Sequence, residues 1–263
     1  MRGPTPAIRF DAVAKTYPVR PLPLRAVERV SFAVARGEFV ALLGPSGCGK
    51  STLLAMAAGL EAPTEGMVEV GGAMLEKPHR DTALMFQDAT LLPWLSVLDN
   101  VLFPATIRKL RREEVLPRAM QLIEMVGLKG FERRRPHELS GGMRQRAAIC
   151  RALVLDPQLL LMDEPFSALD AITRDEMAVV LLDIWQHTAK SAIFVTHSIR
   201  EAVLLADRVM VMSRRPATIA EELVIPFARP RLPDLADSQE FTDICAHLRA
   251  TIAHGMAGPD TGR

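Results

Sequence analysis

The sequence predicts an α/β fold built on a mostly parallel sheet that is covered by helices. Short, fully apolar runs at 39–43, 159–162 and 192–195 are typical of strands buried on both faces. These runs alternate with helical patterns, and this alternation favours a parallel sheet. Residues alternate between apolar and polar at 8–13 and 30–34, which indicates strands with one exposed face.

The stretch 93–155 is predicted to be mostly helical. Ser96 and Asp99 have the spacing of a capping box, the arrangement that satisfies free N–H groups at a helix start. Ser140 is predicted to cap a second helix that begins at Gly141. The last segment carries an apolar stripe at helical spacing, which favours packing on the same domain. A helix that faces a partner protein is the alternative.

The composition excludes several classes of protein. The chain of 263 residues has 32 Lys and Arg against 31 Asp and Glu, so nothing indicates a nucleic-acid-binding surface. The three cysteines are odd in number and far apart, which favours a reducing cytosol over a disulfide scaffold. We expect no signal peptide and no transmembrane helix, so any membrane spans would belong to other chains.

Residues 44–52 fit the phosphate-binding loop pattern, which is Gly, four residues, then Gly-Lys-Ser/Thr. A predicted strand precedes the loop and a predicted helix follows it. In such a loop Lys50 reaches the terminal phosphates and the Ser51 hydroxyl ligates magnesium. A glycine-rich turn that binds nothing is the alternative. The candidate nucleotide-binding residues here are Gly44, Pro45, Ser46, Gly47, Cys48, Gly49, Lys50, Ser51 and Thr52.

Acidic and basic side chains stand at the ends of two other predicted strands. Asp163 and Glu164 follow one apolar run, and His197 follows another. Because ligands bind beyond the carboxyl ends of parallel strands, we expect these residues to converge on one crevice. Asp163 is then placed to hold magnesium, and Glu164 to polarise an attacking water. A pair of solvated acids is the alternative.

A second candidate anion site lies at Leu139-Ser-Gly-Gly-Met143, where two glycines follow the helix cap. Ser140, Gly141 and Gly142 expose the backbone of a helix N-terminus, which attracts anions. Taken alone, this motif is also explained as a cap followed by flexible glycines.

Together these motifs resemble the nucleotide-binding subunit of ATP-binding cassette (ABC) transporters over about residues 8–215. The resemblance implies the ABC ATPase fold of the P-loop NTPases, in which an antiparallel β part and a helical subdomain accompany the parallel core. It implies an ATPase domain over 1–234, with the helical subdomain at about 92–155, and a helical tail over 235–263.

The resemblance also implies roles for single residues. Tyr17 would stack on adenine, and Gln87 would sense both magnesium and the attacking water. Asp170 lies in the D-loop of the family. The implied catalytic residues are Glu164, His197, Gln87 and Lys50, and the implied magnesium ligands are Ser51, Gln87 and Asp163.

The family's cofactors and partners are implied in the same way. The cofactors are ATP and Mg²⁺. Two copies would form a head-to-tail homodimer, with ATP between the phosphate loop of one copy and Ser140–Gly142 of the other. The implied partners also include two transmembrane permease subunits and, indirectly, an extracytoplasmic solute-binding protein. The chain would then lie peripherally on the cytoplasmic face of the inner membrane.

Some positions depart from the commonest pattern of the family. Met143 stands where glutamine is frequent, and Ser198 stands where aspartate is frequent. With the segments 86–94, 168–174 and 214–216, these positions are similar to the nitrate/sulfonate/taurine importer branch. That branch includes relatives that handle thiamine-precursor pyrimidines. The implied solute is a small anion such as a sulfonate, taurine or nitrate.

Three other functions compete with an importer. They are an exporter ATPase, a soluble ABC ATPase outside transport, and a scaffold that binds nucleotide without turnover. Glu164 and His197 argue against the scaffold, because the hydrolytic residues are intact.

Two residues carry further hypotheses. Trp94 is expected in an exposed apolar groove that receives a short helix of the membrane subunit, and burial in the helical subdomain's own core is the alternative. Cys48 lies beside Lys50 and a helix start, which predicts a lowered thiol pKa and labelling by maleimide that ATP prevents. A small buried filler is the alternative.

Overall fold

The computed structural model describes residues 5–188, 190–231 and 233–256. The chain forms two compact units, of which unit 1 comprises Met1–His79 and Ala189–Arg263, and unit 2 comprises Arg80–Thr188. The predicted domain bounds at 234 and at 92–155 stay predictions, and the end of the predicted tail, 257–263, lies outside the described residues.

Unit 1 contains an antiparallel sheet with the strand order β2-β1-β4-β5. β1 and β2 run further than the alternating patterns predict, because they pair along nearly their whole length, from Ile8↔Val34 to Tyr17↔Leu24. The rings of Phe10 and Phe32 stack between them with centroids 4.5 Å apart. The strands are β1 (Ile8–Tyr17), β2 (Leu24–Val34), β4 (Glu65–Val70) and β5 (Ala73–Met74).

A second, mixed sheet of unit 1 has the order β10-β9-β3-β8. β3 (Phe39–Leu43) is wholly buried and pairs in parallel with both β8 (Ser191–Thr196) and β9 (Arg208–Met212). This confirms the predicted parallel core. β10 (Ile219–Val224) adds an antiparallel edge that the sequence analysis missed within its proline- and arginine-rich surroundings.

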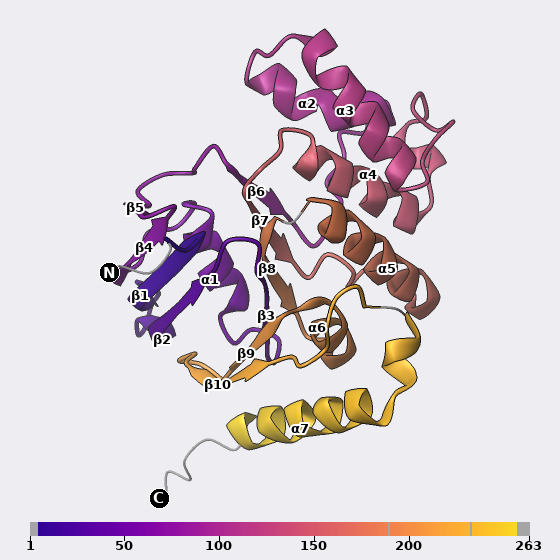
Figure 1. Cartoon of the computed structure of the whole chain (residues 1–263). Coiled ribbons are helices and arrows are strands. Elements are labelled where there is room, and N and C mark those ends of the chain that lie inside the picture. Colours follow the sequence, from indigo (N-terminus) through magenta and orange to yellow (C-terminus); the bar gives the residue numbers. More distant parts are fainter. Residues whose placement is uncertain (1–4, 189, 232, 257–263) are drawn as a thin grey trace, which may run out of the picture. The chain divides into compact units, whose positions relative to one another are not determined.

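The helices of unit 1 are α1 (Lys50–Ala57), α6 (Ile199–Leu205) and α7 (Gln239–Met256), with a short 3-10 turn at Pro233–Asp237. Figure 1 shows α7 running beside β9 and β10, which it contacts. Phe241 stacks on Phe227 at 6.1 Å between ring centroids. The apolar stripe of the last helix therefore packs on its own unit, as predicted.

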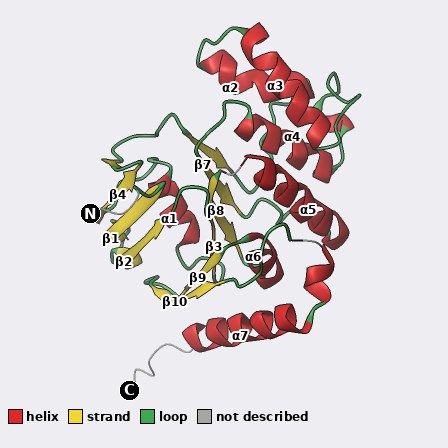
Figure 2. Cartoon of the chain, viewed as in Figure 1, coloured by secondary structure: helices red, strands yellow, loops and turns green. Residues whose placement is uncertain are grey.

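Unit 2 is mainly helical, with a parallel pair of strands. Figure 2 shows its helices in red. α4 packs against α2, α3, α5 and the strand β6. The elements are β6 (Thr82–Met85), α2 (Val97–Ile107), α3 (Arg112–Met125), a 3-10 turn at Pro136–Glu138, α4 (Gly141–Leu153), β7 (Leu159–Asp163) and α5 (Ala171–Thr188).

Both predicted helix caps are present in unit 2. Ser96 Oγ accepts a hydrogen bond from Asp99 N at 3.1 Å, and Ser140 Oγ accepts one from Met143 N at 3.2 Å. Each bond satisfies an N–H group that has no partner within its helix. The caps therefore fix where α2 and α4 begin.

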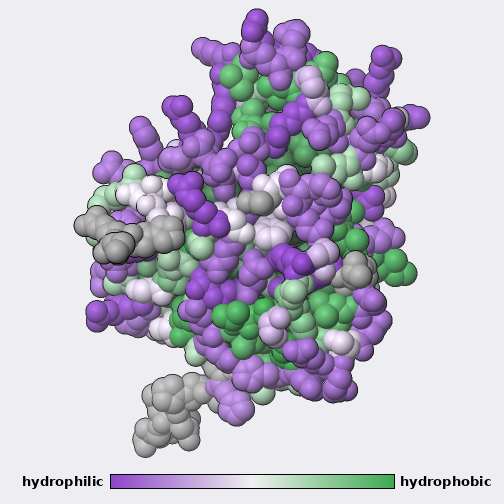
Figure 3. All heavy atoms as spheres, in the orientation of Figure 1, coloured by the Kyte–Doolittle hydropathy of each residue, from purple (hydrophilic) through white to green (hydrophobic). Residues whose placement is uncertain are grey.

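Among the described residues, no helix is both long and apolar enough to cross a membrane. The face drawn in Figure 3 carries hydrophilic side chains interrupted by smaller hydrophobic areas.

Candidate nucleotide site

The phosphate loop starts where the central strand of unit 1 ends. In the sheet register Leu43 lies opposite Thr196 of β8 and Val211 of β9. Because these strands are parallel, Gly44 and His197 follow neighbouring strand ends at one edge. The structure therefore brings the phosphate loop and His197 together, as the sequence predicts.

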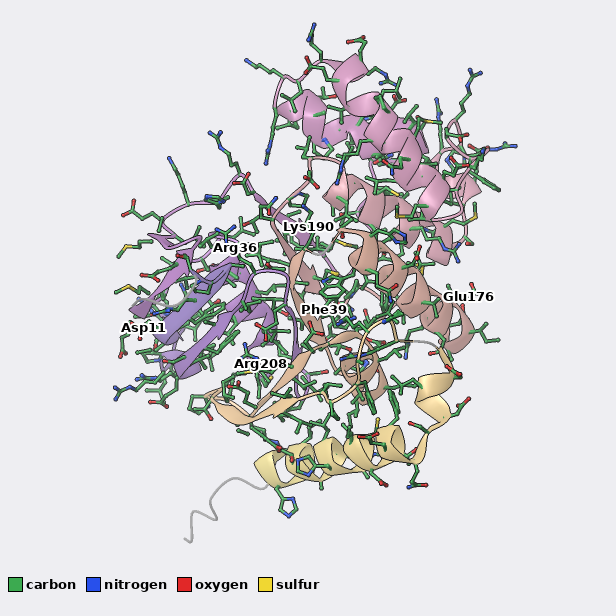
Figure 4. All side chains as sticks on the ribbon, in the orientation of Figure 1. Asp11, Arg36, Phe39, Glu176, Lys190 and Arg208 are labelled. Carbon is green, nitrogen blue, oxygen red and sulfur yellow. The ribbon has the colours of Figure 1, made fainter. Side chains whose placement is uncertain are left out.

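Polar contacts fix the opposite end of this sheet. Asp207 Oδ2 accepts a hydrogen bond from Phe39 N at 2.9 Å, and Arg208 Nε lies 3.0 Å from Glu38 Oε1. Figure 4 labels Phe39 and Arg208 in unit 1. Ser191 Oγ accepts a hydrogen bond from Gly37 N at 2.9 Å. These contacts hold the register that aligns the functional ends.

Two glycines give the loop its conformation. Gly47 has a φ of +73° and Gly49 a φ of +125°, values at which other residues are strained. A Cβ at Gly49 would lie 2.9 Å from the carbonyl oxygen of Ala26, so no side chain fits there. The pattern requires glycine at Gly49 both for its backbone angle and for its packing.

Lys50 is the first residue of α1, and its ammonium is held inside the loop. The residue is only 4% exposed, and Nζ donates hydrogen bonds to the carbonyl oxygens of Gly44 and Pro45, both at 2.9 Å. Ser51 follows and is exposed. A buried cation, a helix start and a backbone bent at two glycines fit the terminal phosphates of a nucleotide.

Cys48 corrects one prediction. The residue is 2% exposed, and burial raises the pKa of its thiol. Lys50 and Arg215 act to lower that pKa, but the loss of hydration outweighs them. The expectation of a reactive thiol is wrong, and Cys48 is a buried filler that packs behind Gly44.

His197 is exposed on a turn with a defined conformation. Ser198 N donates to Thr196 Oγ1 at 2.9 Å, and Thr196 Oγ1 donates to Glu201 Oε2 at 2.6 Å. Ser198 Oγ accepts a hydrogen bond from Glu201 N and caps α6. Ser198, which departs from the commonest residue of the family, thus has a structural role in holding the His197 turn.

Tyr17 stands at the end of β1, in the other sheet of unit 1, and is half-buried. Lys15 Nζ lies 5.1 Å from the centroid of its ring and 2.7 Å from Glu61 Oε2. A cation over the ring face holds the aromatic plane. The stacking of Tyr17 on adenine stays a prediction.

Unit 2 brings three other predicted residues to one edge. Met85 lies opposite Met162 in the parallel pair of β6 and β7, so Gln87 and the acids Asp163 and Glu164 follow neighbouring strand ends. β6 ends at Met85 and leaves Gln87 exposed.

Glu164 has a φ of +42°, which is uncommon for a residue with a side chain. Its carbonyl oxygen accepts hydrogen bonds from Ser167 N at 3.1 Å and from Ser167 Oγ at 2.9 Å. Ser167 therefore fixes the backbone turn at Glu164.

Thr173 links Asp170 to the predicted anion motif at Ser140–Gly142. This role of Thr173 was not predicted from the sequence. Asp170 accepts hydrogen bonds from Thr173 N at 3.0 Å and Thr173 Oγ1 at 2.7 Å. The backbone bond lowers the pKa of Asp170. A Cβ added to Gly142 would lie 2.6 Å from Thr173 Cγ2. An Asp followed three residues later by Thr was the available signal, because it is a helix-capping pattern.

The site residues therefore form separate groups. Unit 1 joins the loop 44–52 to His197, and unit 2 joins Gln87 to Asp163 and Glu164. That both groups meet at one nucleotide stays a prediction. Among the described residues, no three His, Cys, Asp or Glu side chains gather as a metal cage.

Comparison with known proteins identifies the family. The family model described as ABC transporter matches residues 27–167. The taurine import ATP-binding protein TauB of Burkholderia pseudomallei is 47% identical over 217 residues, covering 82% of this chain and 84% of that protein. The nitrate import ATP-binding protein NrtD of Synechococcus elongatus is 44% identical over 227 residues, covering 85% and 83%.

A solved structure agrees with these matches. The ATP-binding cassette MJ0796, in a dimeric post-hydrolysis state bound to ADP and Pi, superposes with a TM-score of 0.73 at 30% identity. The match covers 84% of this chain and 100% of the MJ0796 chain. The chain belongs to the ABC transporter family. The predicted fold and the predicted function, an ATP-hydrolysing subunit of an importer, are confirmed.

Proposed function

We propose that this chain binds Mg²⁺ and ATP at the loop 44–52 and hydrolyses ATP as a homodimer beneath two permease subunits. One observation carries the proposal: the buried ammonium of Lys50 stands at the same sheet edge as His197. A cation and an imidazole at adjoining strand ends are suited to a terminal phosphate.

Each residue has a distinct part in the reaction. Lys50 and the N–H groups at the start of α1 offset the charge of the phosphates. Glu164 orients and polarises the attacking water, and His197 contacts the γ-phosphate. Ser51, Asp163 and Gln87 hold the magnesium ion, which supplies further charge neutralisation. Tyr17 stacks on the adenine base of ATP.

We place the second half of each nucleotide site on the other copy. Ser140, Gly141 and Gly142 begin α4, and Ser140 and Gly141 are exposed. A helix start with bare backbone N–H groups suits a phosphate presented from outside. MJ0796, the solved relative, is dimeric in both structures compared, the second with a TM-score of 0.72. Asp170, held by Thr173, then lies near the same interface.

An apolar cavity on unit 2 is our candidate for the permease contact. Its volume is about 500 Å³, and residues from β6, α2 and α4 line it. Phe86 and Ile107, which line this cavity, are 50% and 66% exposed, and Trp94, two residues after the lining residue Leu92, is 67% exposed. Large exposed apolar side chains that gather in this way mark interaction sites. The alternative of a buried Trp94 is wrong.

The solute we propose is a small anion, a sulfonate such as taurine, or nitrate. The relatives named for taurine and nitrate import support this class. A solute-binding protein would deliver the anion, and this chain would lie on the cytoplasmic face of the inner membrane. Co-purification of the membrane partner and the binding protein, followed by ligand screening on the latter, tests the solute.

Turnover and assembly test the core of the proposal. Purified chain should release phosphate from ATP in the presence of magnesium, and Glu164→Gln should stop turnover while it leaves binding intact. Light scattering should then find Glu164→Gln as a dimer with Mg²⁺ and ATP, and Lys50→Ala as a monomer. The proposal fails if Glu164→Gln stays monomeric with ATP and wild-type chain shows no turnover with its membrane partners.

A further inference from the structure

A basic loop between β9 and β10 reaches the phosphate loop. Arg215 Nε donates a hydrogen bond to the carbonyl oxygen of Gly47. Its guanidinium is close enough that a Cβ at Gly47 would lie 2.9 Å from Nη2. In the sequence, the segment 214–216 indicates only a branch of the family. The nucleotide site described above does not include the contact between Arg215 and Gly47.

The loop that carries Arg215 is firmly anchored at both ends. Ser213 N donates to the carbonyl oxygen of Thr218 at 3.0 Å, and Thr218 N donates back to Ser213 Oγ at 3.0 Å. Ala217 forms a bridge with Val27 of β2, and its N–H donates to the carbonyl oxygen of Ala26 at 3.0 Å. Hydrogen bonds on both sides of Arg215 therefore hold its turn, in addition to the bond that the Arg215 side chain makes.

The same turn packs directly on the phosphate loop. A Cβ at Gly49 would lie 3.3 Å from Ala217 Cβ, and one at Gly44 would lie 3.0 Å from the carbonyl oxygen of Met212. The loop 44–49 thus touches the end of β9 and the turn that follows it, along most of its length. A displacement of this turn would therefore also displace the backbone of the phosphate loop.

The charge of Arg215 acts on the phosphate loop as well. Arg215 and Lys50 both lower the pKa of the Cys48 thiol, although burial raises it more. Lys50 binds the carbonyl oxygens of Gly44 and Pro45, and Arg215 binds that of Gly47, so the two cations bind nearby peptides of one loop. Arg215 is exposed, whereas Lys50 is buried, so the charge of Arg215 is the one that salt can screen.

We propose that Arg215 is a positioning residue for ATP, which holds the phosphate loop through the carbonyl oxygen of Gly47 and adds positive charge beside the triphosphate. The hydrogen bond to the Gly47 carbonyl fixes the plane of the peptide to Cys48, whose N–H donates to the carbonyl oxygen of Pro45 at 3.3 Å, and so holds the turn of the loop that cradles the phosphates. The inference rests on the proposed binding of ATP at this loop.

The test measures the affinity of the purified full chain for Mg·ATP and for adenosine by calorimetry. Arg215→Ala should weaken Mg·ATP binding about tenfold, which corresponds to ~1.4 kcal/mol, and leave adenosine binding unchanged. Arg215→Lys keeps the charge but loses the planar fork, so it should weaken Mg·ATP binding only about threefold. The effect of Arg215→Ala should shrink at high salt.

Arg214→Ala is the matched control, because Arg214 shares the turn and is also exposed. It should change the affinity for Mg·ATP by less than about twofold. In steady-state turnover Arg215→Ala should raise KM for ATP and leave kcat nearly unchanged, as expected when binding alone is lost. Adenosine binding and thermal melting report on the fold of each variant, and Arg215→Lys carries the test if Arg215→Ala melts early.

The inference is overturned if Arg215→Ala binds Mg·ATP like wild type, or if Arg214→Ala and Arg215→Ala weaken binding equally. Equal losses would mean a general effect of net charge. Lys50→Ala separates this failure from failure of the proposed function. If Lys50→Ala loses ATP and Arg215→Ala does not, only the role of Arg215 falls. If wild-type chain binds no ATP, both fall.

Discussion

Asn100 and Leu92 hydrogen-bond to each other in both directions. Leu92 N donates to Asn100 Oδ1 at 2.7 Å, and Asn100 Nδ2 donates to the carbonyl oxygen of Leu92 at 3.1 Å. The same Nδ2 lies 3.2 Å from the carbonyl oxygen of Leu95 and 3.0 Å from that of Ser96. Asn100 is fully buried, with 0% exposure. One amide therefore holds the loop that presents Trp94.

Removal of this amide should destabilise the chain. Asn100→Ala leaves buried backbone groups of the Trp94 loop without partners, which should lower the free energy of unfolding by about 2–4 kcal/mol. Urea denaturation of the full chain measures the change. Gln121→Ala, which removes an exposed amide from α3, should cost less than about 0.5 kcal/mol. Equal losses for the two variants would contradict the role of Asn100.

Trp94→Ala should separate transport from hydrolysis. Because Trp94 is 67% exposed, its loss should change the free energy of unfolding by about 0.5 kcal/mol or less and leave the ATPase activity of the isolated chain intact. Solute uptake by the reconstituted transporter should fall, since the apolar contact with the permease is lost. Phe131→Ala removes another exposed aromatic of unit 2, which lies outside the loop held by Asn100, and should leave uptake unchanged. Normal uptake by Trp94→Ala would rule out docking at this residue.

Gly142 should not tolerate a methyl group. A Cβ there would lie 2.6 Å from Thr173 Cγ2, so Gly142→Ala must separate the starts of α4 and α5, with a loss of about 1–3 kcal/mol and of ATP turnover. Gly141→Ala is the matched control for stability, because its Cβ would lie 3.5 Å from Leu169 Cδ2, an ordinary contact.

The double variant Gly142→Ala with Thr173→Ser isolates the cause. Serine lacks Cγ2 but keeps the hydroxyl that bonds Asp170, so stability and turnover should largely return. Persistent loss in the double variant, measured by melting and by phosphate release, would mean that Gly142 is needed for another reason.

The thiols of the folded chain should react in a fixed order. Burial raises the pKa of all three thiols, those of Cys48, Cys150 and Cys245, so the order of labelling follows how accessible each sulfur is. Cys245 is partly exposed and should be labelled first by maleimide, giving about one label per folded chain near pH 7.5 by mass spectrometry. Labelling of Cys48 should stay slow up to about pH 9, with or without ATP. Fast labelling of Cys48 that ATP prevents would restore the original expectation.

Much of the fold could be predicted from short-range patterns. The apolar runs became β3, β7 and β8, and the caps at Ser96 and Ser140 start α2 and α4 as expected. These features depend on residues adjacent in sequence, where spacing alone constrains the structure.

The rest depends on contacts between distant residues. β10 is a strand because it pairs with β9 beside a turn of proline and arginine, which hid its alternation. Cys48 has a raised pKa because the fold buries it, and proximity to Lys50 in sequence does not show this. Thr173 packs against Gly142, which is 31 residues away along the chain. Arg215 hydrogen-bonds to Gly47, which is 168 residues away.

The in-register pairing of β3 with β8 has a consequence for how this chain can change. Gly44 and His197 belong to neighbouring strands, whose separation in any sheet is ~4.8 Å, so their spacing is built into the backbone ladder. Deleting one residue inside β8 would draw His197 back by ~3.3 Å and turn every following side chain to the other face. Loops that avoid this ladder, such as 18–23, are free to lengthen. Variation among relatives should therefore accumulate as loop insertions and be nearly absent as length changes within these strands.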